Sequence, residues 1–437
     1  MPKKVQGTED LLGSYMREWE RMLAIAREVF GTYGFDAVET PALEQVDTFV
    51  HGIGESTDVV RKEMFRVVSG ALLDDLLTAG NESGLKARQR LALRPEGTAG
   101  FVRAAVENNL VPQGAAPVKA WYAGTMFRGE RPQKGRLRQF HQVGVEVLGA
   151  SDPALDAELI IMLIEFFVRL GFAPETLKLR INSMGDTACR PAYRASVRDF
   201  ILAHADEMCE DCRERAELNP LRAFDCKNLA CSEIMRGAPL VTNHLCAECA
   251  AHYAQVKAYL DETGIAYEED PTLVRGLDYY TRTVFEVDVE EAGVGAIGGG
   301  GRYDGLVELE GGKPTPGIGF AVGFERISLA LKALGYSPEP ALEPCVFVAC
   351  TPDQRGAAFS ATRVLRTAGI RTEADYQGRS LKSQFKLADK LGARLCVVLG
   401  PDEEAVGSAT LRDMETHEQE LVTLAHLVDT IKARLEA

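Results

Sequence analysis

The segment 127–140 carries the residue types that bind nucleotides. Its charged side chains are those of Arg128, Glu130, Arg131, Lys134, Arg136 and Arg138, and an aromatic ring stands at each end. Guanidinium groups form paired hydrogen bonds to phosphate oxygens, and an aromatic face accepts a nucleobase by stacking. The segment therefore predicts a nucleotide-binding loop, and the alternative interpretation is a solvated basic loop.

Two glycine-rich segments lie further along the chain. Residues 296–304 contain four consecutive glycines, which let the backbone approach a ligand closely because no Cβ is present. No Gly-Lys-Ser/Thr follows, which excludes a P-loop, and a dinucleotide-binding fingerprint lacks its strand–helix–strand context. Residues 316–326 indicate a strand that leads into a helix and end in Arg326, which could face a phosphate. For both segments the alternative is a structural bulge or turn.

Two further segments concentrate polar side chains that suit a small polar ligand. Residues 273–281 place Arg275, a carboxylate and two adjacent tyrosines within a few positions, just before a predicted strand. Residues 93–98 hold Glu96 and Thr98 at a rigid turn, where they could bind an ammonium group. Such a density of oriented polar groups favours a ligand pocket over a hydrophobic core.

The elements that must position these side chains follow from hydrophobic periodicity. Helical spacing predicts helices over 19–33 and 153–170, each ending at a glycine. Alternation predicts strands over 35–40, 118–126, 142–148, 177–182 and 283–289. The strands at 118–126 and 142–148 would form a hairpin whose tip is basic. Because strands and helices do not alternate regularly, the pattern favours a largely antiparallel α+β domain over a parallel doubly wound sheet.

Changes in composition predict the domain organisation. Residues 1–335 form one domain, in which 186–270 is a Cys-rich and mostly helical insertion. Residues 336–344 hold three prolines and predict a stiff linker. From 345 to 437 the chain begins as a regular strand–helix series, typical of a separate α/β domain. Cations at 378–394 lie along a predicted helix of this domain, as a solvated face or a binding surface.

Composition and charge bound the class of protein. The chain has 437 residues, and its net charge of −15 is the opposite of a generic nucleic-acid binder. Charges more than about 10 Å apart are screened at physiological salt, so the local basic patch still allows a polyanionic partner. No signal-peptide pattern and no apolar run long enough for a bilayer are found, so we expect a cytoplasmic protein without a membrane segment.

Ten cysteines in such a chain are expected to remain reduced. Two Cys-x-x-Cys pairs make Cys209, Cys212, Cys246 and Cys249 the candidate ligands of a structural zinc ion. Cys226 and Cys231 lie between the pairs, so six cysteines exceed the four that a tetrahedral site needs. The alternative is that all six are reduced, packed thiols. The remaining cysteines are expected in cores or strands, and they are Cys189, Cys345, Cys350 and Cys396.

Six segments of the chain resemble the motifs of bacterial-type histidyl-tRNA synthetases and occur in the same order along the sequence. This family belongs to the class II aminoacyl-tRNA synthetases, and the resemblance covers essentially the whole chain. Three class II motifs are matched by 34–41, 127–146 and 317–326. The remaining segments resemble two histidine-specific signatures and the amino-acid pocket, and they are 273–280, 299–305 and 93–98. The resemblance implies a class II antiparallel-sheet catalytic core, a C-terminal anticodon-binding domain and a homodimer formed through motif 1. It also implies that ATP with Mg²⁺ activates L-histidine to histidyl-adenylate, and that histidine then passes to the 3′ end of tRNA(His).

The resemblance assigns the ATP-binding residues. Arg128 would bind the α-phosphate, and Phe140 would stack on adenine against Arg326. Arg136 and Arg326 would hold the outer phosphates, and Glu130 would contact the adenine or the acceptor end of the tRNA. Positioning and charge would carry the chemistry, without a covalent enzyme intermediate.

It also assigns the residues around the amino acid. Arg275 would lie across the α-phosphate from Arg128, and these two arginines are the expected catalytic residues. Glu96, Thr98 and Gln142 would bind the ammonium group, and Glu146 and Tyr280 would reach the imidazole nitrogens. Further residues expected to line this pocket are Gly97, Tyr279 and Tyr303.

One residue departs from the family pattern, because Gly129 stands where a bulkier side chain is expected. Two other functions remain in competition. The first is the synthetase-like regulatory subunit of ATP phosphoribosyltransferase, which generally lacks an anticodon-binding domain, so residues 345–437 oppose it. The second is a class II synthetase for another amino acid such as proline or glycine, which the two histidine-specific signatures oppose.

Overall fold

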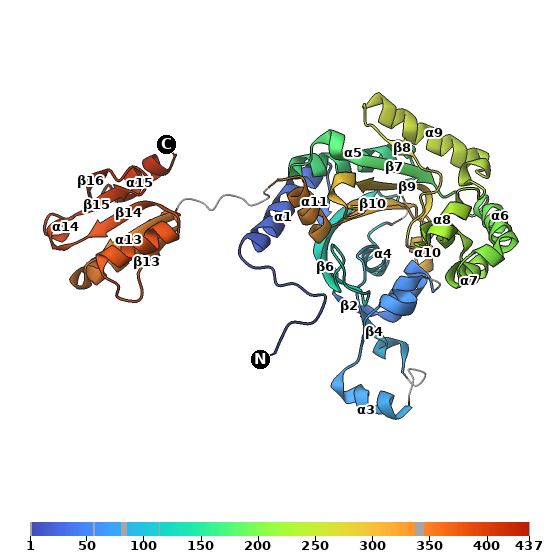
Figure 1. Ribbon diagram of the computed structural model, residues 1–437, viewed down its shortest axis with the longest axis horizontal. Helices are drawn as coiled ribbons and strands as arrows, with labels where there is room; N and C mark the ends of the chain where they lie inside the picture. The colour runs from blue at the N-terminus through green and yellow to red at the C-terminus, as the bar shows by residue number, and fades with distance from the viewer. Residues whose placement is uncertain (1, 56, 80–84, 113, 337–344, 437) are drawn as a thin grey trace. The chain divides into compact units, whose positions relative to one another are not determined.

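The computed structural model describes residues 2–55, 57–79, 85–112, 114–336 and 345–436 (Figure 1). The chain divides into two compact units, a larger unit with the described residues up to Tyr336 and a smaller unit with those from Cys345. Each unit has hydrophobic cores built only from its own residues. The predicted linker, residues 336–344, lies outside the described residues except for Tyr336.

An eight-stranded sheet forms the centre of the larger unit. Its strand order is β1-β5-β6-β11-β10-β9-β7-β8, and every pair from β5 to β7 is antiparallel (Figure 1). In that order the strands are β1 Asp36–Ala37, β5 Val118–Phe127, β6 Gln139–Leu148, β11 Gly317–Gly323, β10 Gly298–Arg302, β9 Thr281–Asp288, β7 Lys178–Ser183 and β8 Glu268–Glu269. The predicted antiparallel α+β class and the β5–β6 hairpin are thereby confirmed. The strand predicted over 35–40 is reduced to β1, which pairs with β5 in parallel.

Four helices share a hydrophobic core with one face of this sheet. They are α1 Ser14–Thr32, α5 Pro153–Leu170, α9 Ala247–Glu262 and α11 Phe324–Ala333. The sequence sets the ends of α5, because the Asp152 carboxylate accepts a hydrogen bond from the Ala154 N–H (2.8 Å) and Gly171 adopts a left-handed φ of 118°. In β6, Val143, Val145 and Val147 enter this core. Since side chains alternate along a strand, Gln142 and Glu146 point to the other face, where the site lies.

Shorter elements complete the larger unit. A three-stranded antiparallel sheet is formed by β2 Leu43–Gln45, β4 Leu91–Leu93 and β3 Arg66–Val67. Its neighbours in the chain are α2 Val46–Ile53, α3 Gly70–Ala79 and α4 Thr98–Glu107. The Cys-rich region contains α6 Arg190–Ala203, α7 Glu210–Leu218 and α8 Leu229–Met235, and the short α10 Leu306–Leu309 follows β10. These helices contribute to a second core beside the sheet.

The smaller unit is a five-stranded mixed sheet with helices. Its strand order is β13 Thr372–Ala374, β12 Cys345–Cys350, β14 Ala393–Leu399, β15 Ser408–Asp413 and β16 Gln419–Thr423. The first three strands are parallel, as the strand–helix series predicts, and the last two add an antiparallel hairpin that was not predicted. The helices are α12 Arg355–Thr367, α13 Leu381–Lys390, α14 Pro401–Ala405 and α15 Leu427–Glu436.

A search of the described residues for membrane-spanning segments gave none, since every helix there is too short or too polar.

Candidate active site

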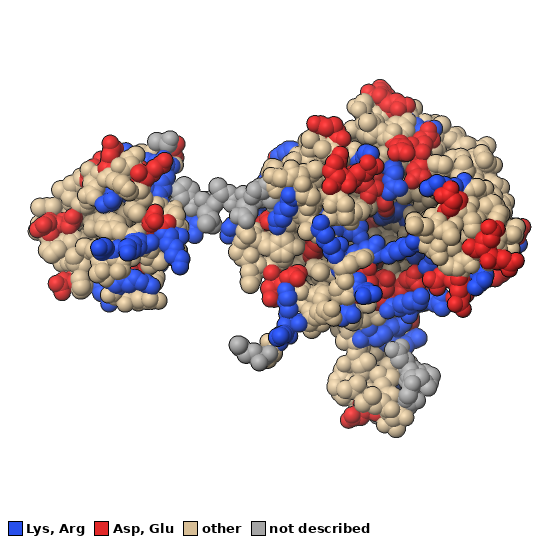
Figure 2. All heavy atoms as spheres, in the orientation of Figure 1, with Lys and Arg blue, Asp and Glu red and all other residues tan. Residues whose placement is uncertain are grey.

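One cavity on the open face of the large sheet receives side chains from five of the six matched segments. We call it the central cavity, and its predicted lining residues are Glu96, Thr98, Arg128, Glu130, Arg136, Phe140, Gln142, Arg275, Tyr279, Tyr280, Tyr303 and Arg326. Figure 2 shows Lys and Arg side chains gathered around the hollowed middle of the larger unit. The fold thus brings together residues that lie more than 200 positions apart in the chain.

The backbone of β10 and β11 forms the floor of the central cavity. A Cβ on Gly300 would lie 2.0 Å from the carbonyl oxygen of Gly319, and one on Gly319 would lie 2.0 Å from Glu146 Oε2. A Cβ on Gly299 would lie 2.9 Å from Arg275 Nη1. The register between β10 and β9 shifts between Gly301 and the next residue. The glycine-rich segment therefore also contains a β-bulge, which was the alternative interpretation from the sequence. Glycine is required here because neighbouring backbones and the arginine occupy the space of any side chain.

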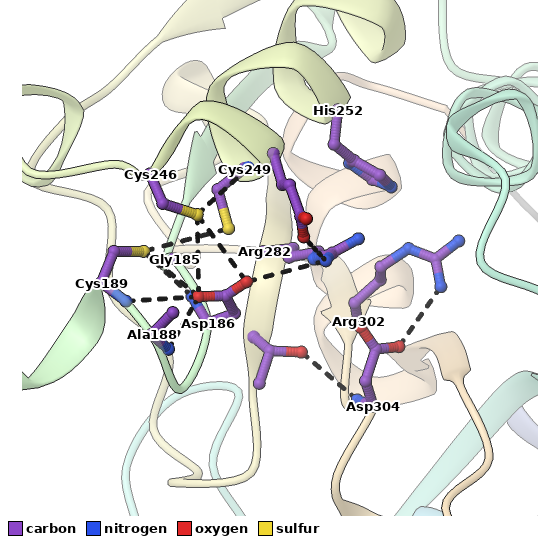
Figure 3. A network of polar contacts seen from close by, with 12 residues as sticks. Gly185, Asp186, Ala188, Cys189, Cys246, Cys249, His252, Arg282, Arg302 and Asp304 are labelled. Atoms are coloured by element: carbon purple, nitrogen blue, oxygen red, sulfur yellow. Dashed lines mark hydrogen bonds and ion pairs between the residues drawn. The ribbon is translucent and has the colours of Figure 1, made fainter.

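Arg302 ends this glycine run and is structural. Its guanidinium is fully buried and lies 2.6 Å from Asp156 Oδ1, a residue of α5. It also donates to the carbonyl oxygens of Ala150 (3.0 Å) and Asp152 (3.2 Å), and it pairs with Asp304 at 3.3 Å (Figure 3). Arg302 therefore ties β10 to the start of α5 and does not line the central cavity.

Three arginines converge in one part of the central cavity, which we call the arginine-rich end. Arg128 Nε donates to the Pro95 carbonyl oxygen (2.9 Å), and its guanidinium lies 5.3 Å from the ring centre of Phe140. Arg136 pairs with Glu130 at 3.3 Å. Arg326, on α11, donates to the carbonyl oxygen of Ala296 at 2.7 Å. Burial and the nearby positive charge of Arg136 lower the pKa of the Arg326 guanidinium. An anion bound here would offset the cost of burying this charge and the repulsion between the two arginines.

Arg275 lines the same cavity. Its guanidinium forms an ion pair with Glu286 and lies 5.7 Å from the ring centre of Tyr280. Glu286 also accepts from Arg180 at 2.9 Å. Sequence reasoning missed Glu286, although it stands between the buried Phe285 and Val287 of a predicted strand. That alternation places its carboxylate on the open face of the sheet.

Buried carboxylates border the part of the cavity lined by Tyr279, Tyr280 and Tyr303, which we call the tyrosine-rich end. Glu96 accepts hydrogen bonds from the backbone N–H groups of Thr98 (2.8 Å) and Ala99 (2.9 Å), while burial raises its pKa. Glu146 lies behind the lining residues and accepts from Thr98 Oγ1 (2.7 Å) and the Tyr303 hydroxyl (2.5 Å). The Tyr122 hydroxyl also donates to Glu146 at 3.2 Å.

Tyr122 was also missed from the sequence. A Cβ on Gly97 would lie 2.2 Å from its ring, so Gly97 makes room for Tyr122 and does not itself line the cavity. The sequence shows only that this tyrosine lies inside the predicted strand 118–126. It does not show which residues of the neighbouring strands the tyrosine contacts.

Replacing Glu146 by glutamine should change the pH dependence of stability. Burial raises the pKa of Glu146 to about 8, above the value of about 4.3 for an unfolded chain. The folded state therefore binds the proton more tightly, and wild-type stability falls as pH rises from about 5 to about 8. Glutamine stays neutral, so the melting temperature of Glu146→Gln should rise relative to wild type over that range, by the equivalent of roughly 2–4 kcal/mol. Thermal unfolding followed by circular dichroism measures this.

Glu107→Gln, at an exposed carboxylate of α4, is the matched control and should show a pH-independent difference from wild type. A difference for Glu146→Gln that stayed constant with pH would show that this carboxyl does not titrate in the range.

Comparison of the chain with known proteins identifies the family to which it belongs. The histidyl-tRNA synthetase family model matches residues 7–327, and the anticodon-binding domain model matches residues 345–434. The chain belongs to the histidyl-tRNA synthetase family. A histidine–tRNA ligase of Anaeromyxobacter dehalogenans is 47% identical over 426 residues, which is 97% of each chain. The crystal structure of apo S. aureus histidyl-tRNA synthetase has a TM-score of 0.79 at 34% identity, and the match covers 99% of this chain and 100% of that one.

A solved ATP phosphoribosyltransferase regulatory subunit/histidyl-tRNA synthetase from Bacillus halodurans has a TM-score of 0.62 at 20% identity. This likeness concerns the fold alone. The match to the anticodon-binding domain over residues 345–434 agrees with the C-terminal domain that the resemblance implied.

Gly129, which departs from the pattern expected of the family, has a local structural reason. Its backbone N–H donates to the Glu63 carbonyl oxygen at 2.5 Å. A Cβ on Gly129 would lie only 3.2 Å from that same oxygen. The connector after β5 therefore runs against the backbone at Glu63, and a larger residue would push the two segments apart.

The cysteines are arranged differently from the expectation. The two Cys-x-x-Cys pairs belong to separate clusters, because Cys209 and Cys212 begin α7 while Cys246 and Cys249 begin α9. The first pair meets Cys226 and Cys231. The second meets Asp186 and Cys189 from the loop after β7. Cys189 is buried, as expected, and it also belongs to this second cluster. Cys345 and Cys396 are buried in the smaller unit, as predicted.

Proposed function

We propose that this chain is a histidine–tRNA ligase that uses the central cavity for both steps of the reaction. ATP activates L-histidine to histidyl-adenylate and pyrophosphate, and histidine is then transferred to the 3′ end of tRNA(His). The observation that carries the proposal is the convergence of arginines from three separate segments beside a pocket of tyrosines and buried carboxylates. Membership in the histidyl-tRNA synthetase family supports it.

The arginine-rich end accommodates ATP. Arg128 is anchored through Nε and lines the cavity, so its terminal nitrogens can donate to the α-phosphate. Phe140 stacks on the adenine against Arg326, while Arg136 and Arg326 hold the outer phosphates. Glu130, already paired with Arg136, contacts the adenine or the acceptor end of the tRNA. ATP enters with Mg²⁺, which offsets negative charge on the phosphates.

The tyrosine-rich end accommodates histidine. Glu96, Thr98 and Gln142 bind the ammonium group. Tyr280, which lines the cavity, reaches one imidazole nitrogen. Glu146, which accepts hydrogen bonds from the hydroxyls of Thr98 and Tyr303, supports the other. The remaining pocket residues are Tyr279 and Tyr303, and Gly97 contributes indirectly, because it leaves room for the Tyr122 ring. Because its pKa lies near 8, the Glu146 carboxyl is largely protonated at neutral pH and can donate a hydrogen bond as well as accept one.

The chemistry needs positioning and charge. A carboxylate oxygen of histidine attacks the α-phosphorus, an O–P bond forms, and the bond to pyrophosphate breaks. Arg128 and Arg275 stabilise the charge that develops on the α-phosphate oxygens, and Glu286 holds the Arg275 guanidinium in place. A ribose hydroxyl at the 3′ end of the tRNA then attacks the carbonyl carbon, and AMP leaves.

The smaller unit supplies a surface for the tRNA anticodon. Residues 379–394 carry five cations along α13 and its flanks, namely Arg379, Lys382, Lys386, Lys390 and Arg394. A band of Lys and Arg side chains crosses this unit in Figure 2. Phosphate contacts from such a band give affinity without sequence specificity. We further propose a cytoplasmic homodimer, assembled through residues 34–41.

Amino-acid-dependent exchange of pyrophosphate into ATP tests this function. The purified chain should catalyse exchange with histidine and with no other amino acid. Exchange with proline or glycine would reassign it to another class II specificity. A protein that failed to exchange with histidine but stimulated an ATP phosphoribosyltransferase would instead be a regulatory subunit.

A further inference from the structure

The inserted region contains two clusters of metal-ligating side chains away from the central cavity. The four-thiol cluster consists of Cys209, Cys212, Cys226 and Cys231. The mixed cluster consists of Asp186, Cys189, Cys246 and Cys249 (Figure 3). Within each cluster the four ligand atoms all lie within 4.8 Å of one another, and in each two of the four residues are buried.

The four-thiol cluster has the dimensions of a single-ion site. Cys209 Sγ and Cys226 Sγ are 3.8 Å apart. A tetrahedral zinc ion with bonds of about 2.3 Å to sulfur places its ligands about 3.8 Å apart. A disulfide requires about 2.05 Å between sulfurs. An iron–sulfur cluster interposes several ions, so it would hold its cysteines farther apart.

The surroundings of this cluster also suit thiolates. Cys231 Sγ accepts a hydrogen bond from the Cys209 backbone N–H at 3.2 Å. Such donors orient metal-bound sulfur and stabilise its negative charge. The four residues come from the start of α7, from the end of the short helix Pro220–Asp225, and from α8. A single ion would therefore join three short helices that also share a hydrophobic core.

The mixed cluster has comparable geometry. Cys189 Sγ lies 3.9 Å from Cys249 Sγ and 3.5 Å from Asp186 Oδ1, and Cys246 Sγ lies 3.9 Å from the same carboxylate. Backbone N–H groups of Asp186 and Cys249 donate to cluster sulfurs at 3.3 and 3.5 Å. In Figure 3 the three sulfurs and the carboxylate point toward one another. Zinc accepts carboxylate oxygen as well as thiolate sulfur.

We propose that the inserted region binds two zinc ions, one in the four-thiol cluster and one in the mixed cluster. In each cluster four ligand atoms from different elements gather around one point, which is the arrangement that a tetrahedral metal ion needs. Tetrahedral sites built from thiolates select zinc among divalent cations that lack redox chemistry.

Each ion would stabilise residues of the inserted region that form hydrogen bonds or ion pairs with the segment 273–282. Side chains of that segment line the central cavity. Beside the four-thiol cluster, Asn219 Nδ2 donates to Asp278 Oδ1 (2.6 Å) and Arg222 donates to the Arg275 carbonyl oxygen (3.3 Å). Beside the mixed cluster, Asp186 pairs with Arg282 at 3.6 Å, and Arg190 donates to the Tyr280 carbonyl oxygen at 2.6 Å. The two ions would thus support the pocket without touching its ligands.

Metal analysis of the full-length, untagged chain tests the proposal. Protein purified without chelators should contain two zinc ions per chain by plasma mass spectrometry. Cys226→Ser and Cys189→Ser should each leave one, and the double variant should leave none. Cys350→Ser, in the smaller unit, is the matched control and should retain two. No zinc in the wild-type protein would overturn the proposal for both clusters, and a variant that kept two would overturn it for its own cluster.

Two measurements on the wild-type chain do not depend on variants that fold. Replacement of the metal by cobalt(II) should produce thiolate-to-cobalt charge-transfer absorption and tetrahedral d–d bands. A denatured, metal-depleted sample should titrate as ten thiols. Fewer thiols would indicate disulfides, and iron in place of zinc would give a coloured protein; either outcome would overturn the assignment.

Discussion

Replacing Arg275 by alanine is expected to lower histidine-dependent pyrophosphate exchange by about 10³-fold. In the proposed mechanism Arg275 and Arg128 both stabilise the α-phosphate, so the charge of Arg275 acts mainly as negative charge develops on the phosphate. The expected change is therefore in kcat, while the dissociation constant for histidine should stay within a few fold of wild type. Single-turnover formation of histidyl-adenylate measures the rate of the chemical step, and equilibrium binding measures the dissociation constant for histidine.

Arg180→Ala provides a matched control for this experiment. Arg180 pairs with the same Glu286 as Arg275 does, but it does not line the central cavity. We expect that variant to keep most of the exchange activity. If Arg275→Ala exchanged at the wild-type rate, the catalytic assignment of Arg275 would be wrong. An equal loss of exchange in both variants would also contradict it, because it would show that the two arginines act only by holding Glu286 in position.

Removal of residues 345–437 is expected to separate the two steps of the reaction. Aminoacylation of tRNA should fall by about 10²-fold or more, because a second binding surface on the same ligand contributes through effective concentration. Pyrophosphate exchange should remain within about twofold of the full chain, because it involves no tRNA contact. The cores of the larger unit contain no residue of the smaller one, so the shortened protein should fold.

A full-length variant with Lys382→Ala and Lys386→Ala, both on α13, tests the same division without a deletion. It should raise the KM for tRNA and leave exchange unchanged. Equal losses of charging and exchange after the deletion would contradict the proposed separation of roles.

Local sequence signals predicted most of the framework. The cap at Asp152 and the glycine at 171 set the limits of α5, and alternation located β5, β6, β7 and β9. The side chains expected in the pocket were also largely brought together, since twelve of them line one cavity. These predictions succeeded because each depends on periodicity, capping or a contiguous motif.

Features that depend on pairing between distant segments could not be predicted. Nothing in the sequence shows that Glu286 meets Arg275, because that contact depends on the path of the loop before β9 relative to the strand itself. The division of the cysteines has the same origin: spacing indicates pairs, but only the fold places Cys189 against Cys249. The hairpin β15–β16 was missed because its strands are short and one is largely exposed.

The glycine floor restricts how the protein could evade a competitive inhibitor. Any side chain added at residue 299 or 319 would collide with backbone, with Arg275 or with Glu146 before it reached a bound molecule. Resistance by substitution must therefore arise in the walls, such as Gln142 or Leu277, which also line the cavity. A compound that draws its affinity from backbone groups of β10 and β11 would leave few routes of escape.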